Sequence, residues 1–195
     1  FGKITAYRGS DGKVLWFHDQ KEGAYYGPVI LYRDMVITQS GGGSNSGYPI
    51  TKALNIFTGE HVTRTHPLTK ETIPWQWLRF KGCNSAIASA NLMAFRSGSA
   101  SFIDLTKGQG TSSLGGFRAG CTSNLIPANG VLSAPDYTRT CTCSYQNQAS
   151  LAMIHTPEGE AWSFDYYPNV GKATPIMHVG LNLGAPGNRF GEKGV

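Results

Sequence analysis

Short runs in which apolar and polar residues alternate fill most of this chain, and turns rich in Gly, Pro, Asn and Asp separate them. Alternation with a period of two is typical of a half-buried β-strand, and no stretch shows the 3.6-residue period of a long helix. We therefore predict an all-β fold. The expected strands occupy residues 3–8, 13–17, 28–33, 35–39, 50–56, 60–64, 84–89, 91–96, 100–105, 113–118, 122–127, 130–134, 149–155 and 160–164.

Two stretches near the middle of the chain align without a gap. "GCNSAIASAN" begins at Gly82 and "GCTSNLIPAN" begins at Gly120, an offset of 120 − 82 = 38 residues. Both read G-C-x-S-x-(I/L)-x-x-A-N and both lead into an apolar run. A period near 40 residues is the size of one four-stranded propeller blade, so the repeat favours a β-propeller.

A second repeat, eleven residues long, occurs in other stretches of the chain. "AYRGSDGKVLW" ends at Trp16, "ALNIFTGEHVT" ends at Thr63, and "AMIHTPEGEAW" ends at Trp162. Each reads as a strand, a tight turn with Gly and a second strand. Gly12 and Gly59 share one position, where the turn needs a positive φ. A terminal Trp gives a blade a large apolar plate that can pack against its neighbour.

This second repeat resembles the tryptophan-docking motif of quinoprotein-type β-propellers, the PQQ-like repeat proteins. The stretches "GCNSAIASANLMAFRSG", "AGCTSNLIPANGVLSAPD", "CTCSY" and "GLNLGAPGNR" further resemble a branch of large secreted bacterial PQQ-like repeat proteins. The motif is imperfect here: Thr63 stands where the motif has Trp, Arg8 and Ile154 stand where it has Asp or Asn, and the third blade has no clear copy.

The resemblance implies a propeller segment of about three and a half four-stranded antiparallel blades in residues 1–164. Residues 165–195 lose the pattern and are expected to form an exit segment towards a following module. A partial propeller would leave unpaired sheet edges, which invite aggregation. We therefore expect the remainder of the propeller, or another protein chain, as a partner.

The four cysteines are predicted to lie on one face of the propeller. Cys83 and Cys121 each precede the first strand of a blade, and Cys141 and Cys143 lie between the second and third strands of the fourth blade. An even count suits an oxidising compartment, so we predict two disulfides and a periplasmic or extracellular location. Four cysteines allow 3 pairings, and we leave the pairing open. A metal site and a redox pair are the alternatives, but the C-x-C spacing matches neither well.

The distribution of charge along the chain limits the classes of partner that we expect. The formal net charge is +5, but the 17 Lys and Arg residues are spread along the sequence without a basic run. This distribution gives no basis for a nucleic-acid surface. No apolar run approaches the roughly 18 residues that span a bilayer, so we expect no membrane span.

The loops of the same face supply the candidate ligand-binding residues. Trp75 and Trp77 can stack on a sugar or a quinone, or else they seal the gap between blades. Arg79 and Arg118 can hold a carboxylate through paired hydrogen bonds, as can Arg96. The other candidates are polar side chains near strand ends: Asn84, Asn124 and Asp136. The sequence identifies no catalytic residue and no metal-ligand spacing among its His residues.

Two functions remain open. The first is a binding or assembly scaffold, similar to outer-membrane assembly lipoproteins that share the repeat without the cofactor, with a carbohydrate or another small molecule as its ligand. The alternative is a quinoprotein-type oxidoreductase. The resemblance then implies pyrroloquinoline quinone and Ca²⁺, with Trp75, Arg118 and Asp136 as candidate contacts. The imperfect docking motifs and the lack of a clear Ca²⁺ constellation favour the scaffold.

Overall fold

The computed structural model describes residues 3–19, 28–39, 51–66, 70–80, 82–106, 110–120, 124–136, 147, 149–156, 165–166 and 175. Within these ranges every regular element is a β-strand, and every paired strand runs antiparallel to its neighbour. The predicted all-β class is therefore confirmed. No described segment forms an apolar helix of the length that a bilayer requires.

The chain begins with a hairpin of β1 (Ile4–Tyr7) and β2 (Val14–His18), as predicted for residues 3–8 and 13–17. Its turn is closed by two backbone hydrogen bonds: the Arg8 N–H donates to the Lys13 carbonyl (2.7 Å), and the Gly12 N–H donates to the Arg8 carbonyl (2.8 Å). Gly12 has a φ of 70°. A residue with a Cβ would be strained there, which explains the Gly.

The same turn recurs in the second copy of the eleven-residue repeat. The Asn55 N–H donates to the Glu60 carbonyl (2.8 Å), and the Gly59 N–H donates to the Asn55 carbonyl (2.9 Å). Both bonds join positions equivalent to those in the first copy. The repeat in the sequence is therefore also a repeat in backbone geometry.

A third turn of this kind was not predicted from the sequence. It lies between β6 (Thr63–Thr65) and β7 (Thr72–Pro74), where the His66 N–H donates to the Glu71 carbonyl (2.8 Å). The Lys70 N–H in turn donates to the His66 carbonyl (3.0 Å), and Lys70 has a φ of 60°. Lys in place of the expected Gly conceals this copy from a motif search.

The second sheet has the order β3-β4-β5-β8, formed by β3 (Ile30–Tyr32), β4 (Met35–Ile37), β5 (Thr51–Asn55) and β8 (Gln76–Trp77). The fourth strand predicted at residues 60–64 is only partly formed, because residues 60–62 pair with β5 and the following residues do not. Leu54 pairs with His61 in a single bridge, after which the chain leaves as the β6–β7 hairpin. It returns as β8 to pair with the first half of β5, so two segments share the fourth position.

The third sheet has the order β16-β12-β11-β10-β9. Its strands are β9 (Ile87–Ala88), β10 (Leu92–Ser97), β11 (Ser99–Asp104), β12 (Thr111–Ser113) and β16 (Asp165–Tyr166). The first three agree with prediction. The fourth ends at Ser113 and not at residue 118, because Gly115 (φ 64°) and Gly116 (φ 68°) turn the chain. Strand β16 lies at the start of the predicted exit segment.

The fourth sheet is a meander of β13 (Ile126–Ala128), β14 (Val131–Ala134) and β15 (Leu151–Ile154). Asn129 (φ 51°) and Gly130 (φ 76°) form the two-residue turn between β13 and β14, where both positions require a positive φ. The predicted strand at residues 160–164 lies outside the described residues.

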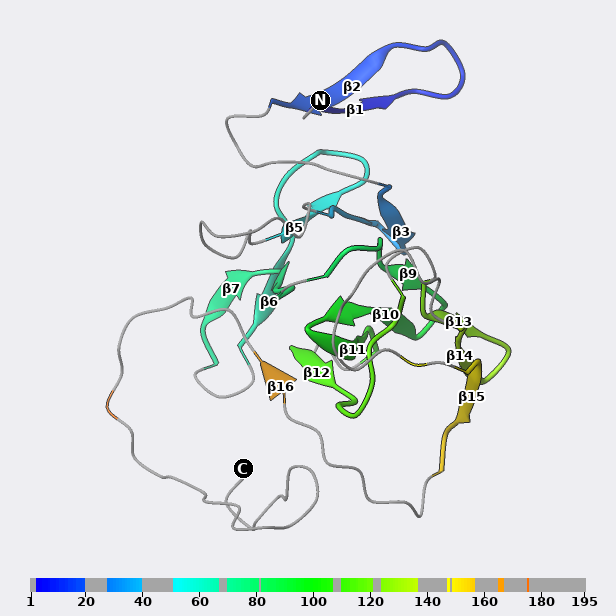
Figure 1. The fold of residues 1–195 in the computed structure, drawn as a ribbon. Helices are drawn as coiled ribbons and strands as arrows, with labels where there is room; N and C mark the ends of the chain where they lie inside the picture. Colours follow the sequence, from blue (N-terminus) through cyan, green and yellow to red (C-terminus); the bar gives the residue numbers. More distant parts are fainter. Residues whose placement is uncertain are drawn as a thin grey trace.

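These sheets stack face to face in chain order. Figure 1 shows β9–β12 between β3–β5 on one side and β13–β15 on the other. Successive side chains of β10 point to opposite faces, so Met93 and Phe95 enter the core shared with the second sheet while Ala94 enters the core shared with the fourth. All three are fully buried. The third sheet is thus covered on both faces.

The N-terminal hairpin is attached through Trp16. The indole lies against Gly59, where an added Cβ would stand 2.7 Å from two ring carbons. The indole Nε1–H donates to the Ile56 carbonyl (2.9 Å), and the His18 Nε2–H donates to the Gly59 carbonyl (2.6 Å). The tryptophan of the first repeat copy is therefore packed on the glycine turn of the second.

This contact predicts an unequal cost for the same substitution at two equivalent glycines. Gly12→Ala introduces left-handed strain alone, about 1–2 kcal/mol, because an added Cβ there meets nothing within 4 Å. Gly59→Ala should cost about 1–3 kcal/mol more, because its Cβ overlaps Trp16. Urea unfolding measures both free energies of unfolding. In a Trp16→Ala background the difference should become smaller, because the two ring carbons at 2.7 Å are removed while the Cβ at 3.0 Å remains. Equal costs in the wild-type background would contradict the contact.

Candidate functional site

The two loop tryptophans are core residues. Trp75 is 6% exposed and Trp77 is 1% exposed. The Trp77 Nε1–H donates to the Thr38 carbonyl (3.1 Å), and its ring meets Phe95 edge to face with centroids 4.7 Å apart. The Arg64 guanidinium lies over the Trp75 ring, 5.7 Å from its centroid. These residues were expected either to stack on a ligand or to seal the gap between blades. In the structure they fill the space between sheets.

The Gln39 side chain joins the second sheet to the third by forming the two hydrogen bonds that a neighbouring strand would form. Its Oε1 accepts from the Ala86 N–H (2.7 Å) and its Nε2–H donates to the Ala86 carbonyl (3.1 Å). A primary amide carries the same donor and acceptor as a peptide group, so it can satisfy both backbone groups of one residue. Gln39 was expected as the last residue of the strand at 35–39, and its link to the third sheet was not predicted.

Arg79 lies at the centre of a buried polar network. It is 5% exposed, and its Nε–H donates to the Arg96 carbonyl (2.9 Å). Its Nη2–H donates to the Asn84 Oδ1 (3.2 Å), and the Asn84 Nδ2–H donates to the Gly120 carbonyl (3.0 Å). Asn84 of the first Gly-Cys motif is thereby tied to the Gly of the second. The two motifs that aligned in the sequence also touch in space.

Burial perturbs the charge of Arg79. Loss of hydration lowers the pKa of its guanidinium to about 10, the nearby Cys83 opposes this shift, and the second cation, Arg96, adds to it. At pH 7 Arg79 therefore remains protonated. Arg96 is 1% exposed, and its Nη1–H donates to the Ala119 carbonyl (3.4 Å). Two cations are thus held in the interior, where the charge needs hydrogen-bond acceptors at fixed positions.

The backbone at Gly82 passes directly over these arginines. A Cβ at Gly82 would lie 2.2 Å from the Arg96 carbonyl oxygen and 2.7 Å from two guanidinium nitrogens of Arg79. This close approach explains why the motif has Gly before Cys. Cys83 is exposed, whereas Cys121, Cys141 and Cys143 lie outside the described residues. The predicted disulfides stay a prediction.

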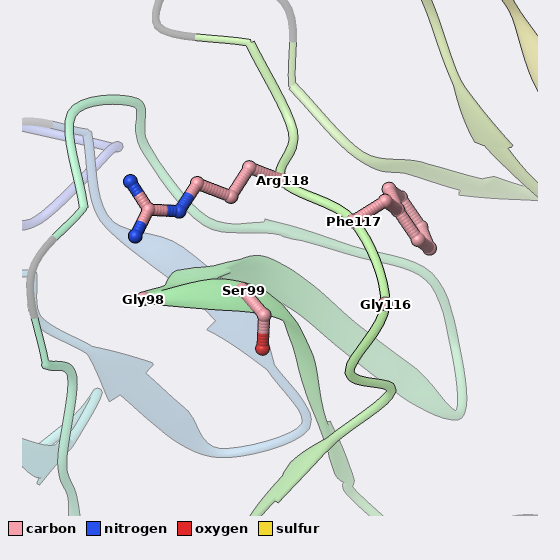
Figure 2. Close-up of a pocket in the computed structure, with 5 residues that line it drawn as sticks. All are labelled: Gly98, Ser99, Gly116, Phe117 and Arg118. Atoms are coloured by element: carbon pink, nitrogen blue, oxygen red, sulfur yellow. The ribbon is translucent and has the colours of Figure 1, made fainter. Parts of the chain in front are cut away.

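The remaining candidates do not converge on Trp75 or Trp77. Asn124 is half-buried, and its Oδ1 has no hydrogen-bond partner within the described ranges. Asp136 is exposed, and its backbone N–H donates to the Ser150 Oγ (3.1 Å). The Arg118 side chain lines a pocket with Gly98, Ser99, Gly116 and Phe117 (Figure 2). Only Arg118 belongs to both the predicted set and the pocket.

A quinone with calcium does not fit these residues. The two indoles that were expected to stack on the ring are buried, and their neighbours already contact them. Arg79 is committed to backbone and amide acceptors inside the fold. Among the described residues, no three His, Cys, Asp or Glu side chains gather in the way that holds a metal ion. We therefore derive no chemistry through such a group.

The Gly82 contact yields a direct test. Gly82→Ala should lower the free energy of unfolding by about 2–3 kcal/mol, because the obstructing atom is backbone and cannot rotate away. Gly9→Ala is the matched control, since its Cβ would meet nothing within 4 Å and should change stability by less than about 0.5 kcal/mol. Urea denaturation followed by circular dichroism measures both. Equal stability of the two variants would refute the close approach over the arginines.

Comparison with known proteins adds no relative to this picture. No family model, no curated protein and no solved structure matches the chain. The resemblance to PQQ-like repeats therefore depends on the motifs in the sequence alone.

Proposed function

We propose that this chain is part of a β-propeller of the PQQ-like repeat type and that it acts as a binding or assembly scaffold outside the cytoplasm. The observation that carries the proposal is the contact of Trp16 with Gly59 and Ile56. It joins the last position of one repeat copy to the turn of the next. In a repeat protein each unit is stabilised by its neighbours, and this contact has that form.

The stacking of sheets supports the same architecture. Successive antiparallel units pack face to face through the core around Phe95 and Trp77 and through the core around Ala94 and Leu125. Propellers arrange four-stranded units radially in this sequential way. The role of a scaffold is favoured over catalysis because the tryptophans, Arg79 and Asn84 are all used to hold neighbouring sheets together.

The outermost sheets leave apolar side chains uncovered. Phe17 of β2 is 63% exposed and Ile154 of β15 is 72% exposed. On the third sheet, the apolar residues Met93, Phe95 and Ile103 are buried between the neighbouring sheets. We propose that the partner of these surfaces is another antiparallel sheet of the same repeat type, either from the rest of a propeller or from a second chain.

Sedimentation velocity tests whether these apolar surfaces associate with another copy of the chain. The purified chain should associate as its concentration rises, because uncovered apolar faces bury area on contact. The double variant Phe17→Lys and Ile154→Lys should shift the equilibrium to monomer. Thr63→Lys, at an exposed position of β6, is the control and should leave association unchanged. A wild-type chain that stays monomeric at every concentration would refute the incomplete stack.

Thermal unfolding with added pyrroloquinoline quinone and Ca²⁺ tests the scaffold against the oxidoreductase. A ligand that binds only the folded state raises the unfolding midpoint, so a scaffold without the cofactor should show no shift. A rise of several degrees, with quinone absorbance that remains on the protein after gel filtration, would favour the enzyme.

A further inference from the structure

The three strands of the fourth sheet contain no charged residue. Their sequences are IPA, VLSA and LAMI, and Ser133 is the one polar side chain among them. An antiparallel sheet that faces water on one side normally carries polar residues on that side. The composition of the fourth sheet is therefore that of a sheet covered on both faces.

The inner face of this sheet is covered within the chain. Leu132, Ala134 and Met153 belong to the core that the fourth sheet shares with the third. Neighbouring residues of a strand point to opposite faces, and directly paired residues share a face. The register therefore places the following residues on the outer face: Ile126, Ala128, Val131, Ser133, Ala152 and Ile154. This face is open, since Ile126 is 41% exposed and Ile154 is 72% exposed.

The outer face of the N-terminal hairpin is also apolar. Trp16 packs on the turn of the second sheet, so its neighbours Leu15 and Phe17 point away from that sheet. Leu15 is 43% exposed and Phe17 is 63% exposed, and Tyr7 at the end of β1 is 62% exposed. Figure 1 shows the hairpin and β13–β15 at the two ends of the series of sheets. Each end of the series therefore presents an apolar face.

The β6–β7 hairpin shows how this chain builds a surface that faces water. Its exposed positions include Thr63, Thr65 and Thr72, while Ile73 between them is buried. This is the usual alternation of polar residues outside and apolar residues inside. The two end faces break this pattern, and contiguous exposed apolar residues mark interaction sites.

We propose that the outer face of the hairpin of one copy of this chain packs on the outer face of the fourth sheet of a second copy. Each contact between sheets inside the chain joins two different faces, and this contact continues the series. None of the residues named on either face is charged, so the contact buries no unpaired charge. The inference rests on the partner sheet proposed above and adds which two faces meet.

The two faces also complement each other in size. The hairpin offers the bulky side chains of Tyr7, Leu15 and Phe17. The fourth sheet offers the small residues Ala128, Ser133 and Ala152 among larger aliphatic ones. Against a copy of itself, the fourth sheet would leave voids at these small residues, and voids forfeit packing energy. Bulky residues from a different face fill them.

Such a contact is head-to-tail. A dimer would keep one hairpin face and one sheet face open, so association continues beyond the dimer into a ring or a longer series. A contact between identical faces would instead stop at the dimer. Sedimentation velocity of the wild-type chain should therefore show species heavier than a dimer as the concentration rises.

Two single variants that each block one face provide the test. Phe17→Lys blocks the hairpin face and Ile154→Lys blocks the sheet face, and both positions are exposed, so circular dichroism should show wild-type folding. Each variant alone should associate at least about tenfold more weakly than wild type, because the contact would bury a charge. An equimolar mixture should form a heterodimer and nothing larger, since one intact face of each kind remains.

The outcomes separate this inference from the proposed function. Thr63→Lys is the control and should associate as the wild type does. Dimers formed by either blocked variant alone would show that identical faces pair, and would overturn the head-to-tail contact while the proposed partner sheet stood. A mixture that stays monomeric while the wild type associates would do the same. A wild-type chain that is monomeric at every concentration would overturn both.

Discussion

Burial of strand β10 on both faces is the constraint on which the rest of the structure depends. Its side chains alternate between two cores, so neither neighbouring sheet can be removed without exposing large apolar surface. Phe95 meets Trp77 on one side, and Ala94 meets Leu125 on the other. The small Ala residues of the second core allow the fourth sheet to approach closely. The third sheet is thus the centre of the stack, and the candidate site is built at one of its ends.

Polar contacts then determine how the sheets are aligned. The Gln39 side chain accepts a hydrogen bond from the backbone N–H of Ala86, and the Asn84 side chain donates one to the backbone carbonyl of Gly120. Hydrophobic packing has little directional preference, whereas each of these amides must meet its acceptor within a fraction of an ångström. Arg79 is constrained in the same way, because burying its charge would cost much free energy without acceptors at fixed positions. Apolar cores hold the sheets together, and buried amides and guanidinium groups determine their alignment.

Much of the fold was predictable from the pattern of residues. Alternation located β1, β2, β10 and β11, and the eleven-residue repeat predicted that Trp16 would pack against a neighbouring unit. The split fourth strand of the second sheet was not predictable, because the β6–β7 hairpin uses Lys70 where the motif has Gly. The roles of Trp75 and Arg79 were also hidden, since sequence reveals the type of a side chain but not which neighbours enclose it. The pocket was missed because its walls are mostly backbone.

The split strand has a consequence for how this sheet can change over evolution. The fourth position beside β5 is filled by a bridge at His61 and by β8, and the chain between them leaves and re-enters the sheet. Hydrogen bonding to β5 needs both segments in place but does not need them to be joined directly. Lengthening a surface excursion costs little loop-closure entropy, so residues can be added between them while the sheet is kept. The β6–β7 hairpin is therefore a natural position for acquired sequence, where a new surface could arise without rebuilding the core.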